Sequence, residues 1–215
     1  MATIDQCKKQ TEFIAGKSGY GAYLSPDNFD LLFNKAQLQY FNALYKNYYA
    51  TQRISDSLSV FKSDPLPIVI PGDGVYSLDP NFKVLHIDAI THVYNGKPFP
   101  VIRVEDDKLA NHLSSEYDAP DLQFPIYTKY KSSIKFNPVN LATASMVYFK
   151  SPATVKWNYT IVNQRAVYSA TGSTHPEWAD NDIENIINLI LVDLAQNMND
   201  QNLQNYSARK NQQGS

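Results

Sequence analysis

The sequence predicts an α+β protein in which helical segments near both ends of the chain flank a central, mostly antiparallel β module. Two amphipathic patterns support the helices, because apolar residues recur at spacings of three and four from Phe29 to Leu44 and again from Ile183 to Leu194. Between them, Asn95-Gly96 is the pair typical of a tight turn joining two antiparallel strands. A chain of 215 residues with 43% hydrophobic residues suits a soluble globular protein of one domain or two small ones.

Residues 1–24 are expected to form an N-terminal arm. Three glycines lie between positions 16 and 21, and only the stretch 4–14 has any helical rhythm. Such an arm either orders on a partner or is a plain disordered terminus.

Residues 25–64 are predicted to be a helical segment. Ser25-Pro26-Asp27 supplies an N-cap, a proline at the first helical position and an acid in the first turn. The helix that begins there continues to about Tyr48, and a second helical stretch runs from Thr51 to Phe61, which Pro65 terminates.

Residues 65–175 are predicted to form a β-rich module. A short amphipathic helix over 106–116 lies inside it, and Asn137-Pro-Val-Asn140 is a turn-forming cluster. The extended runs that we expect to form strands are 68–70, 75–78, 85–94, 99–104, 125–131, 133–137, 145–150, 155–162 and 166–168.

Residues 176–198 are predicted to form a C-terminal helix that completes the helical core. Asp180 and Asn181 are both competent N-caps, and Asn181 with Glu184 resembles a capping box. The chain then becomes rich in Asn and Gln, so residues 199–215 are expected to be a polar tail that frays or docks on a neighbour.

Charge and cysteine content limit the class of protein. Lys and Arg number 19 against 21 Asp and Glu, so no net basic surplus favours sequence-specific DNA binding. The single cysteine, Cys7, cannot form an intrachain disulfide, which favours synthesis in a reducing compartment. Neither a signal sequence nor a run of about 18 apolar residues is recognisable, so we expect no membrane association. Fifteen tyrosines suit protein interfaces.

The residue types that could support chemistry do not form a recognisable site. His86, His92, His112 and His175 lack zinc-site spacing, although the first two would share a face of a regular strand. The acids at positions 105–107 are interpreted as complementing a helix dipole rather than as acid/base catalysts. Cys7 is expected in a poorly structured arm, where no partner would activate its thiol. We therefore assign no catalytic, cofactor-binding or metal-binding residue.

Two groups of aromatic residues could stack on bases or sugars, but core packing and protein interfaces are the commoner destinations of such side chains. The groups are Tyr45, Tyr48 and Tyr49, and Tyr117, Phe124, Tyr127 and Tyr130.

Several spaced prolines and aromatics together resemble the neck adaptor proteins of tailed bacteriophages, and in particular ring proteins of short-tailed, crAss-like phages. The stretches that carry this resemblance are Lys97-Pro-Phe-Pro-Val-Ile-Arg-Val104, Pro125-Ile-Tyr127, Ile134-Lys-Phe-Asn-Pro138, Val147-Tyr-Phe-Lys-Ser-Pro152, Trp157, Asn163-Gln-Arg-Ala-Val-Tyr168 and His175-Pro-Glu-Trp178.

The resemblance implies a structural virion protein of the neck or tail, made in the host cytoplasm and without enzymatic activity. Copies would form a homo-oligomeric ring, implied to be a dodecamer, that binds the portal protein and other neck or tail ring proteins. Genome DNA would pass through the channel during ejection without specific contacts. The alternative is a tail or fibre-associated module that recognises a glycan or a protein through its aromatic β module.

Overall fold

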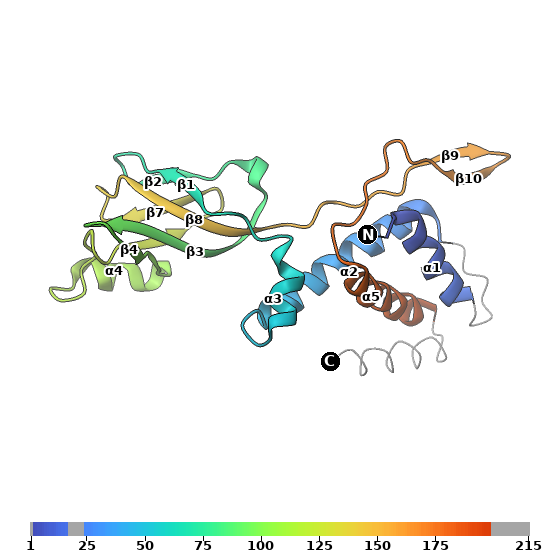
Figure 1. The fold of residues 1–215 in the computed structure, drawn as a ribbon, viewed down its shortest axis with the longest axis horizontal. Coiled ribbons are helices and arrows are strands. Elements are labelled where there is room, and N and C mark those ends of the chain that lie inside the picture. Colours follow the sequence, from blue (N-terminus) through green and yellow to red (C-terminus); the bar gives the residue numbers. More distant parts are fainter. Residues whose placement is uncertain (1, 17–23, 199–215) are drawn as a thin grey trace. The chain divides into compact units, whose positions relative to one another are not determined.

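The computed structural model describes residues 2–16 and 24–198, which form five α-helices, ten β-strands and one short 3-10 helix (Figure 1). The predicted α+β class is confirmed. The chain divides into two compact units, each described here by itself. Unit 1 contains residues 1–60 and 152–215, and unit 2 contains residues 61–151.

In unit 1, helix α2 (Pro26–Lys46) begins where the sequence predicts. The Ser25 hydroxyl accepts a hydrogen bond from the backbone N–H of Asn28 at 3.4 Å, and Pro26 occupies the first turn. Its buried face is mainly aromatic and small apolar residues, which are Pro26, Phe29, Phe33, Ala36 and Phe41 with the polar Gln37.

Helix α5 (Asp180–Met198) packs along α2 and supplies the predicted apolar stripe. Ile183, Ile186, Ile187, Ile190, Leu191 and Leu194 are all buried. The predicted capping box of Asn181 and Glu184 is wrong. The backbone N–H groups of Asp182 and Ile183 both donate to the carbonyl of Ala179, so the helix begins before Asn181. Asn181 therefore lies inside the first turn of α5.

The expectation of an arm over residues 1–24 is wrong for its first half, because helix α1 (Ile4–Gly16) packs against α5. Ile4 and Cys7 are completely buried. Thr3 and Gln6 form a reciprocal capping box, with N–H to side-chain oxygen distances of 3.3 and 2.8 Å. The apolar positions of α1 are too few to predict burial alone, and its stability comes from the partner helix. Residues 17–23 lie outside the described residues.

Two further elements complete unit 1. Helix α3 (Gln52–Ser59) has Thr51 as its N-cap. It confirms the second predicted helical stretch, 51–61, although the helix is shorter than predicted. Strands β9 (Tyr159–Val162) and β10 (Arg165–Tyr168) form a separate antiparallel hairpin. This hairpin was predicted as part of the β-rich module, 65–175, whereas the chain contacts place it in unit 1. The predicted polar tail, 199–215, lies outside the described residues.

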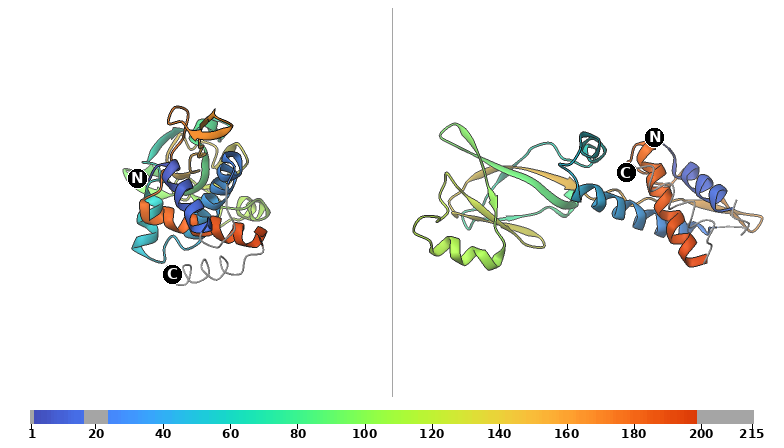
Figure 2. Two further views of the ribbon diagram at one scale, coloured as in Figure 1. Left: turned by 90° about the vertical axis from the view of Figure 1, so that its right-hand side faces the viewer. Right: turned by 90° about the horizontal axis from the view of Figure 1, so that it is seen from below.

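Unit 2 consists of two four-stranded sheets that share one apolar core (Figures 1 and 2). The first sheet has the order β1-β8-β3-β4 and is antiparallel throughout, and the second has the order β2-β7-β6-β5. The strands are β1 (Leu66–Val69), β2 (Val75–Ser77), β3 (Val84–Tyr94), β4 (Lys97–Pro100), β5 (Ile102–Arg103), β6 (Ile126–Lys129), β7 (Ser133–Asn137) and β8 (Thr143–Lys150), with a 3-10 helix at Pro80–Phe82.

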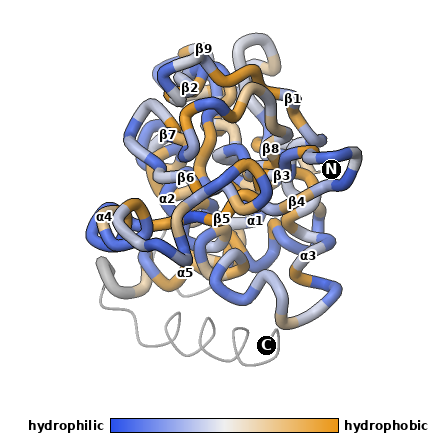
Figure 3. Tube along the Cα trace, turned by 90° about the vertical axis from the view of Figure 1, so that its left-hand side faces the viewer, coloured by the Kyte–Doolittle hydropathy of each residue, from blue (hydrophilic) through white to orange (hydrophobic). Residues whose placement is uncertain are grey.

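The predicted turn at Asn95-Gly96 joins β3 and β4, with φ of 50° and 73° at its two residues. One predicted strand, 99–104, is divided in the structure. The chain leaves the first sheet at Val101 and pairs in parallel with β6 as β5. A parallel connection needs a crossover, which helix α4 (Asp106–Ser114) provides. This helix is mostly hydrophilic and buries none of its residues (Figure 3).

Among residues 2–16 and 24–198, no helix combines the length and apolar character needed to span a lipid bilayer.

Candidate interaction site

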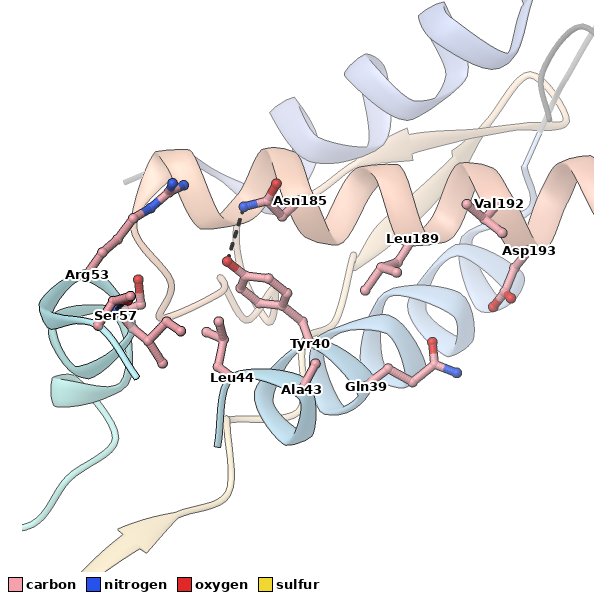
Figure 4. A pocket seen from close by; sticks show the side chains of 12 residues that line it. Gln39, Tyr40, Ala43, Leu44, Arg53, Ser57, Asn185, Leu189, Val192 and Asp193 are labelled. Atoms are coloured by element: carbon pink, nitrogen blue, oxygen red, sulfur yellow. Dashed lines mark hydrogen bonds between the residues drawn. The ribbon is translucent and has the colours of Figure 1, made fainter. Parts of the chain in front are cut away.

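Unit 1 contains a groove of about 930 Å³ between α2, α3 and α5 (Figure 4). Its walls come from the C-terminal half of α2, from the start of α3 and from the middle of α5. Its aliphatic lining residues are Ala43, Leu44, Ile54, Leu189 and Val192, and its polar or charged lining residues include Gln39, Arg53 and Asp193. Such a surface suits the apolar part of a ligand or partner.

A hydrogen-bond network centred on Tyr40 connects the three helices at the groove. The Tyr40 hydroxyl donates to Asp182 at 2.8 Å and accepts from the Asn185 amide at 3.1 Å, and Ser57 also donates to Asp182 at 3.2 Å. Burial and the neighbouring Asp182 raise the pKa of Tyr40 to about 12. The hydroxyl therefore stays protonated near neutral pH and serves as a fixed structural contact.

The ring of Tyr40 also packs on Trp178, with centroids 5.2 Å apart and an interplanar angle of 61°. Trp178 is completely buried and lies before α5, and it also contacts Phe41 at 6.4 Å. This aromatic cluster sets the spacing of α2 and α5 beneath the groove.

The segment that leads to the β9–β10 hairpin is held on α2 by three side chains that lie on one face of the helix. The Asn34 side-chain amide donates a hydrogen bond to the carbonyl of Val155 at 2.9 Å and accepts one from the N–H of Val155 at 2.8 Å. Gln37 donates to the carbonyl of Ala153, and Asp30 accepts the N–H of Trp157 at 2.8 Å. Alternate residues of an extended chain are thus bonded to one stripe of the helix.

Trp157 forms the base of the hairpin. Its ring packs against Tyr159 and Tyr168 at 5.9 and 5.7 Å, its indole N–H donates to Asp5 at 3.1 Å, and the Lys8 ammonium lies 4.9 Å from its ring centroid. Helix α1 therefore contributes directly to the hairpin's position. The other end of the ribbon is exposed, with Ile161 73%, Val162 50% and Val167 46% accessible to solvent. These residues were not predicted as an exposed cluster, because alternating apolar residues in a strand normally indicate a covered face.

The histidines do not come together. His86 and His92 both lie in β3, but a bulge between Ile87 and Ala89 interrupts the alternation, so their spacing does not place them on one face. Burial, with nearby Lys129, lowers the pKa of His86. His112 pairs with Asp118 at 2.8 Å in unit 2.

The fourth histidine, His175, accepts the backbone N–H of Ile4 at 3.2 Å in unit 1. The described ranges contain no group of three or more His, Cys, Asp or Glu side chains arranged to hold a metal ion.

The acids at 105–107 lie at the start of α4, as interpreted from the sequence. Glu105 pairs with Arg103 at 2.9 Å, and Asp106 accepts a hydrogen bond from the Tyr130 hydroxyl at 3.0 Å. Cys7 was expected in a poorly structured arm and is instead buried in α1. Burial raises the pKa of its thiol to about 11, so the reactive thiolate is scarce at neutral pH.

The two predicted aromatic groups lie in different units. Tyr45 stacks on Phe41 at 6.3 Å, and Tyr48 and Tyr49 contact each other at 5.0 Å. In the second group, Tyr127 belongs to the core of unit 2, while Tyr117 is fully exposed.

A different aromatic row lies at the β3–β4 hairpin of unit 2, where Tyr94, Phe99 and Phe124 contact one another in sequence at 6.4 and 6.2 Å. Phe124 is brought there by the loop after α4, which no local sequence pattern indicates. No known family model and no curated protein matches this chain.

Proposed function

We propose that this protein is a structural virion protein that forms a ring-shaped adaptor between the portal and the tail of a bacteriophage. The ring would contain twelve copies and act without enzymatic activity, with genome DNA passing through its channel. The first support is the resemblance of the spaced prolines and aromatics to phage neck adaptors. Those residues contribute to both units, from β4 and β5 in unit 2 to Trp157 and Trp178 in unit 1.

The observation that carries the proposal is a pair of different apolar surfaces on unit 1 that no other described residue covers. One is concave, the groove between α2, α3 and α5, and the other is convex, the exposed end of the β9–β10 hairpin. A head-to-tail ring requires two different complementary patches on every subunit, whereas a two-fold dimer requires only one self-complementary patch. Unit 1 has two different apolar patches, which supports a heterologous assembly.

The charge of the chain is compatible with a DNA channel. A net charge of −2 gives no general attraction for phosphates that would hold DNA during passage.

Electron microscopy tests the adaptor function most directly. The purified full-length protein is mixed with the portal protein encoded by the same phage, and the particles are compared with portal alone. A closed additional ring on the portal is the expected result. Portal particles that remain unchanged at saturating protein would overturn the adaptor function.

A tail or fibre-associated binding module is the second candidate, and the aromatic row of Tyr94, Phe99 and Phe124 favours it, because aromatic surfaces stack on sugar rings. Phe124→Ala removes the most exposed member of this row. Loss of binding on a glycan array, with unchanged ring addition to the portal, would assign the row to recognition. An array without signal for the unmodified protein would remove the glycan form of this alternative.

A further inference from the structure

We propose that Arg103, Lys129 and His86 of unit 2 form a binding site for a single phosphate group. The three residues belong to strands β5, β6 and β3, so they come together only when the unit is folded. None of them belongs to unit 1, which holds the two apolar surfaces. The inference therefore goes beyond the proposed adaptor function and does not depend on it.

Strand pairing brings Arg103 and Lys129 together in the second sheet. Arg103 pairs with Tyr127 in the parallel β5–β6 ladder. Lys129 follows Tyr127 by two residues, and side chains two residues apart project from the same face of a strand. The two long cationic side chains are thus diagonal neighbours on one face, within reach of the same small anion.

Lys129 also reaches the first sheet, where His86 lies. Its ammonium donates a hydrogen bond to the carbonyl of Leu85 in β3 at 3.3 Å, and His86 is the next residue. Strand β4 pairs with β3 only from Thr91 to Tyr94, so within the described residues this part of β3 has a strand on one side alone. Lys129 and His86 are both half-buried, and so remain partly accessible to a ligand from solvent.

The electrostatics of the cluster agree with this geometry. Burial lowers the pKa of Lys129, and the like charge of Arg103 lowers it further. Burial also lowers the pKa of His86, followed by the effects of Lys129 and Arg103. Like charges that are partly removed from water destabilise one another unless an anion compensates them, and such perturbed groups gather at binding sites.

The carboxylates next to these residues leave positive charge at the cluster. Glu105 pairs with Arg103 at 2.9 Å, but the two side chains are 65% and 52% exposed, so this ion pair is weak and a ligand can displace it. Asp88 of β3 is held by Lys62 at 2.7 Å. Lys129 contacts a neutral carbonyl and forms no ion pair among the described residues.

The donor types favour phosphate over a carboxylate. The guanidinium of Arg103 presents a planar fork of N–H groups, the ammonium of Lys129 is a compact point charge, and the imidazole of His86 adds an N–H group. A phosphate group offers three strong acceptor oxygens and up to two negative charges, whereas a carboxylate has two oxygens and one charge. Three donors from three strands match the group with more oxygens.

Proton NMR of the full-length protein tests the site. The ring signals of His86, identified by their loss in His86→Gln, are followed over a pH titration while inorganic phosphate replaces chloride at constant ionic strength. The midpoint of the His86 titration should move to higher pH in phosphate, because a nearby anion favours the imidazolium form. The signals of His112, which is paired with Asp118 in the same unit, should not move.

A pair of variants separates the site from general charge attraction. Lys129→Gln should weaken phosphate binding roughly tenfold or more, because a hydrogen bond between two charged groups is lost. The matched control is Lys97→Gln, which should bind as the unmodified protein does. Lys97 is exposed and pairs with Tyr94, about 27 Å along β3 from His86. Arg103→Gln is the second test variant if Lys129→Gln folds poorly.

A duplex DNA of mixed sequence, added at the same total phosphate concentration, distinguishes two sources of the phosphate group. A response of the His86 signals to DNA at lower concentrations than to inorganic phosphate would assign the site to a nucleic-acid backbone. A response to inorganic phosphate alone would assign it to free phosphate or a small phosphate ester. Either result supports the site.

Two results would overturn the inference. One is a His86 titration that neither inorganic phosphate nor DNA changes relative to chloride. The other is equal phosphate affinity for Lys129→Gln and Lys97→Gln, since the response would then come from general ionic attraction. Ring addition to the portal is measured separately, so failure of the phosphate site leaves the adaptor function standing and the reverse also holds.

Discussion

Replacing Tyr40 by Phe should lower the free energy of unfolding of unit 1 by about 2 kcal/mol. The change keeps the ring against Trp178 but removes the hydroxyl, so Asp182 loses its 2.8 Å donor and retains Ser57 at 3.2 Å. Asp182 is only 4% exposed, so water replaces the lost bond poorly. Hydrogen bonds to charged groups contribute about 1.5–3 kcal/mol, and about 2 kcal/mol corresponds to a roughly thirtyfold change in the unfolding equilibrium.

Tryptophan fluorescence during guanidinium titration is a selective assay for this effect. The chain has two tryptophans, Trp157 and Trp178, and both belong to unit 1. Tyr168→Phe is the matched control, because its ring also packs on a tryptophan while its hydroxyl has no hydrogen bond among the described residues. Equal unfolding midpoints for Tyr40→Phe and Tyr168→Phe would refute the assigned role of the Tyr40 network.

The pH dependence of the same comparison gives an independent check. The folded-state pKa of Tyr40 is raised to about 12 from its ordinary value of 10.0, mainly by burial and then by Asp182. A raised pKa means that the contribution of Tyr40 is fully present below pH 10 and is lost as the pH rises through 12. The stability difference between the unmodified protein and Tyr40→Phe should therefore shrink over that interval and stay constant from pH 6 to 9.

Three other changes test separate parts of the fold. Ile187→Asp should destabilise unit 1 by several kcal/mol, since it places an unpaired charge at a position that is only 1% exposed. The control is Ile161→Asp on the exposed hairpin, which should leave the thermal midpoint of the dilute protein nearly unchanged. Gly74→Ala should destabilise unit 2 by about 1–3 kcal/mol, because φ is +73° and a Cβ would lie 2.9 Å from a backbone oxygen of β7, whereas Gly72→Ala meets nothing within 4 Å. Urea midpoints by circular dichroism distinguish the members of each pair. Cys7 should react with a thiol reagent only as fast as α1 opens, and labelling of the folded protein at the rate of the denatured protein would contradict the docking of α1 on α5.

Local signals in the sequence were sufficient for much of the secondary structure. Ser25-Pro26 starts α2 through a side-chain cap, and Asn95-Gly96 adopts the positive φ values that its residue types allow. The stripe from Ile183 to Leu194 is buried as its period of 3.6 predicts. Each of these features depends on residues within a few positions of one another, so no distant partner had to be known.

Long-range packing decided the remainder. Helix α1 has too little apolar surface to be predicted as part of the core, and its buried residues Ile4 and Cys7 belong to a helix that packs on α5 from the other end of the chain. The groove likewise requires Leu44 and Leu189 to face each other, which depends on how α2 and α5 cross.

Amphipathic periodicity specifies which side of a helix is buried, but not which helix covers it or where a gap is left. Local residue patterns therefore predict most helices and strands of this protein and the apolar faces of α2 and α5. The groove between three helices and the exposure of the hairpin within the described residues depend on tertiary structure, because both are properties of how distant surfaces fit together.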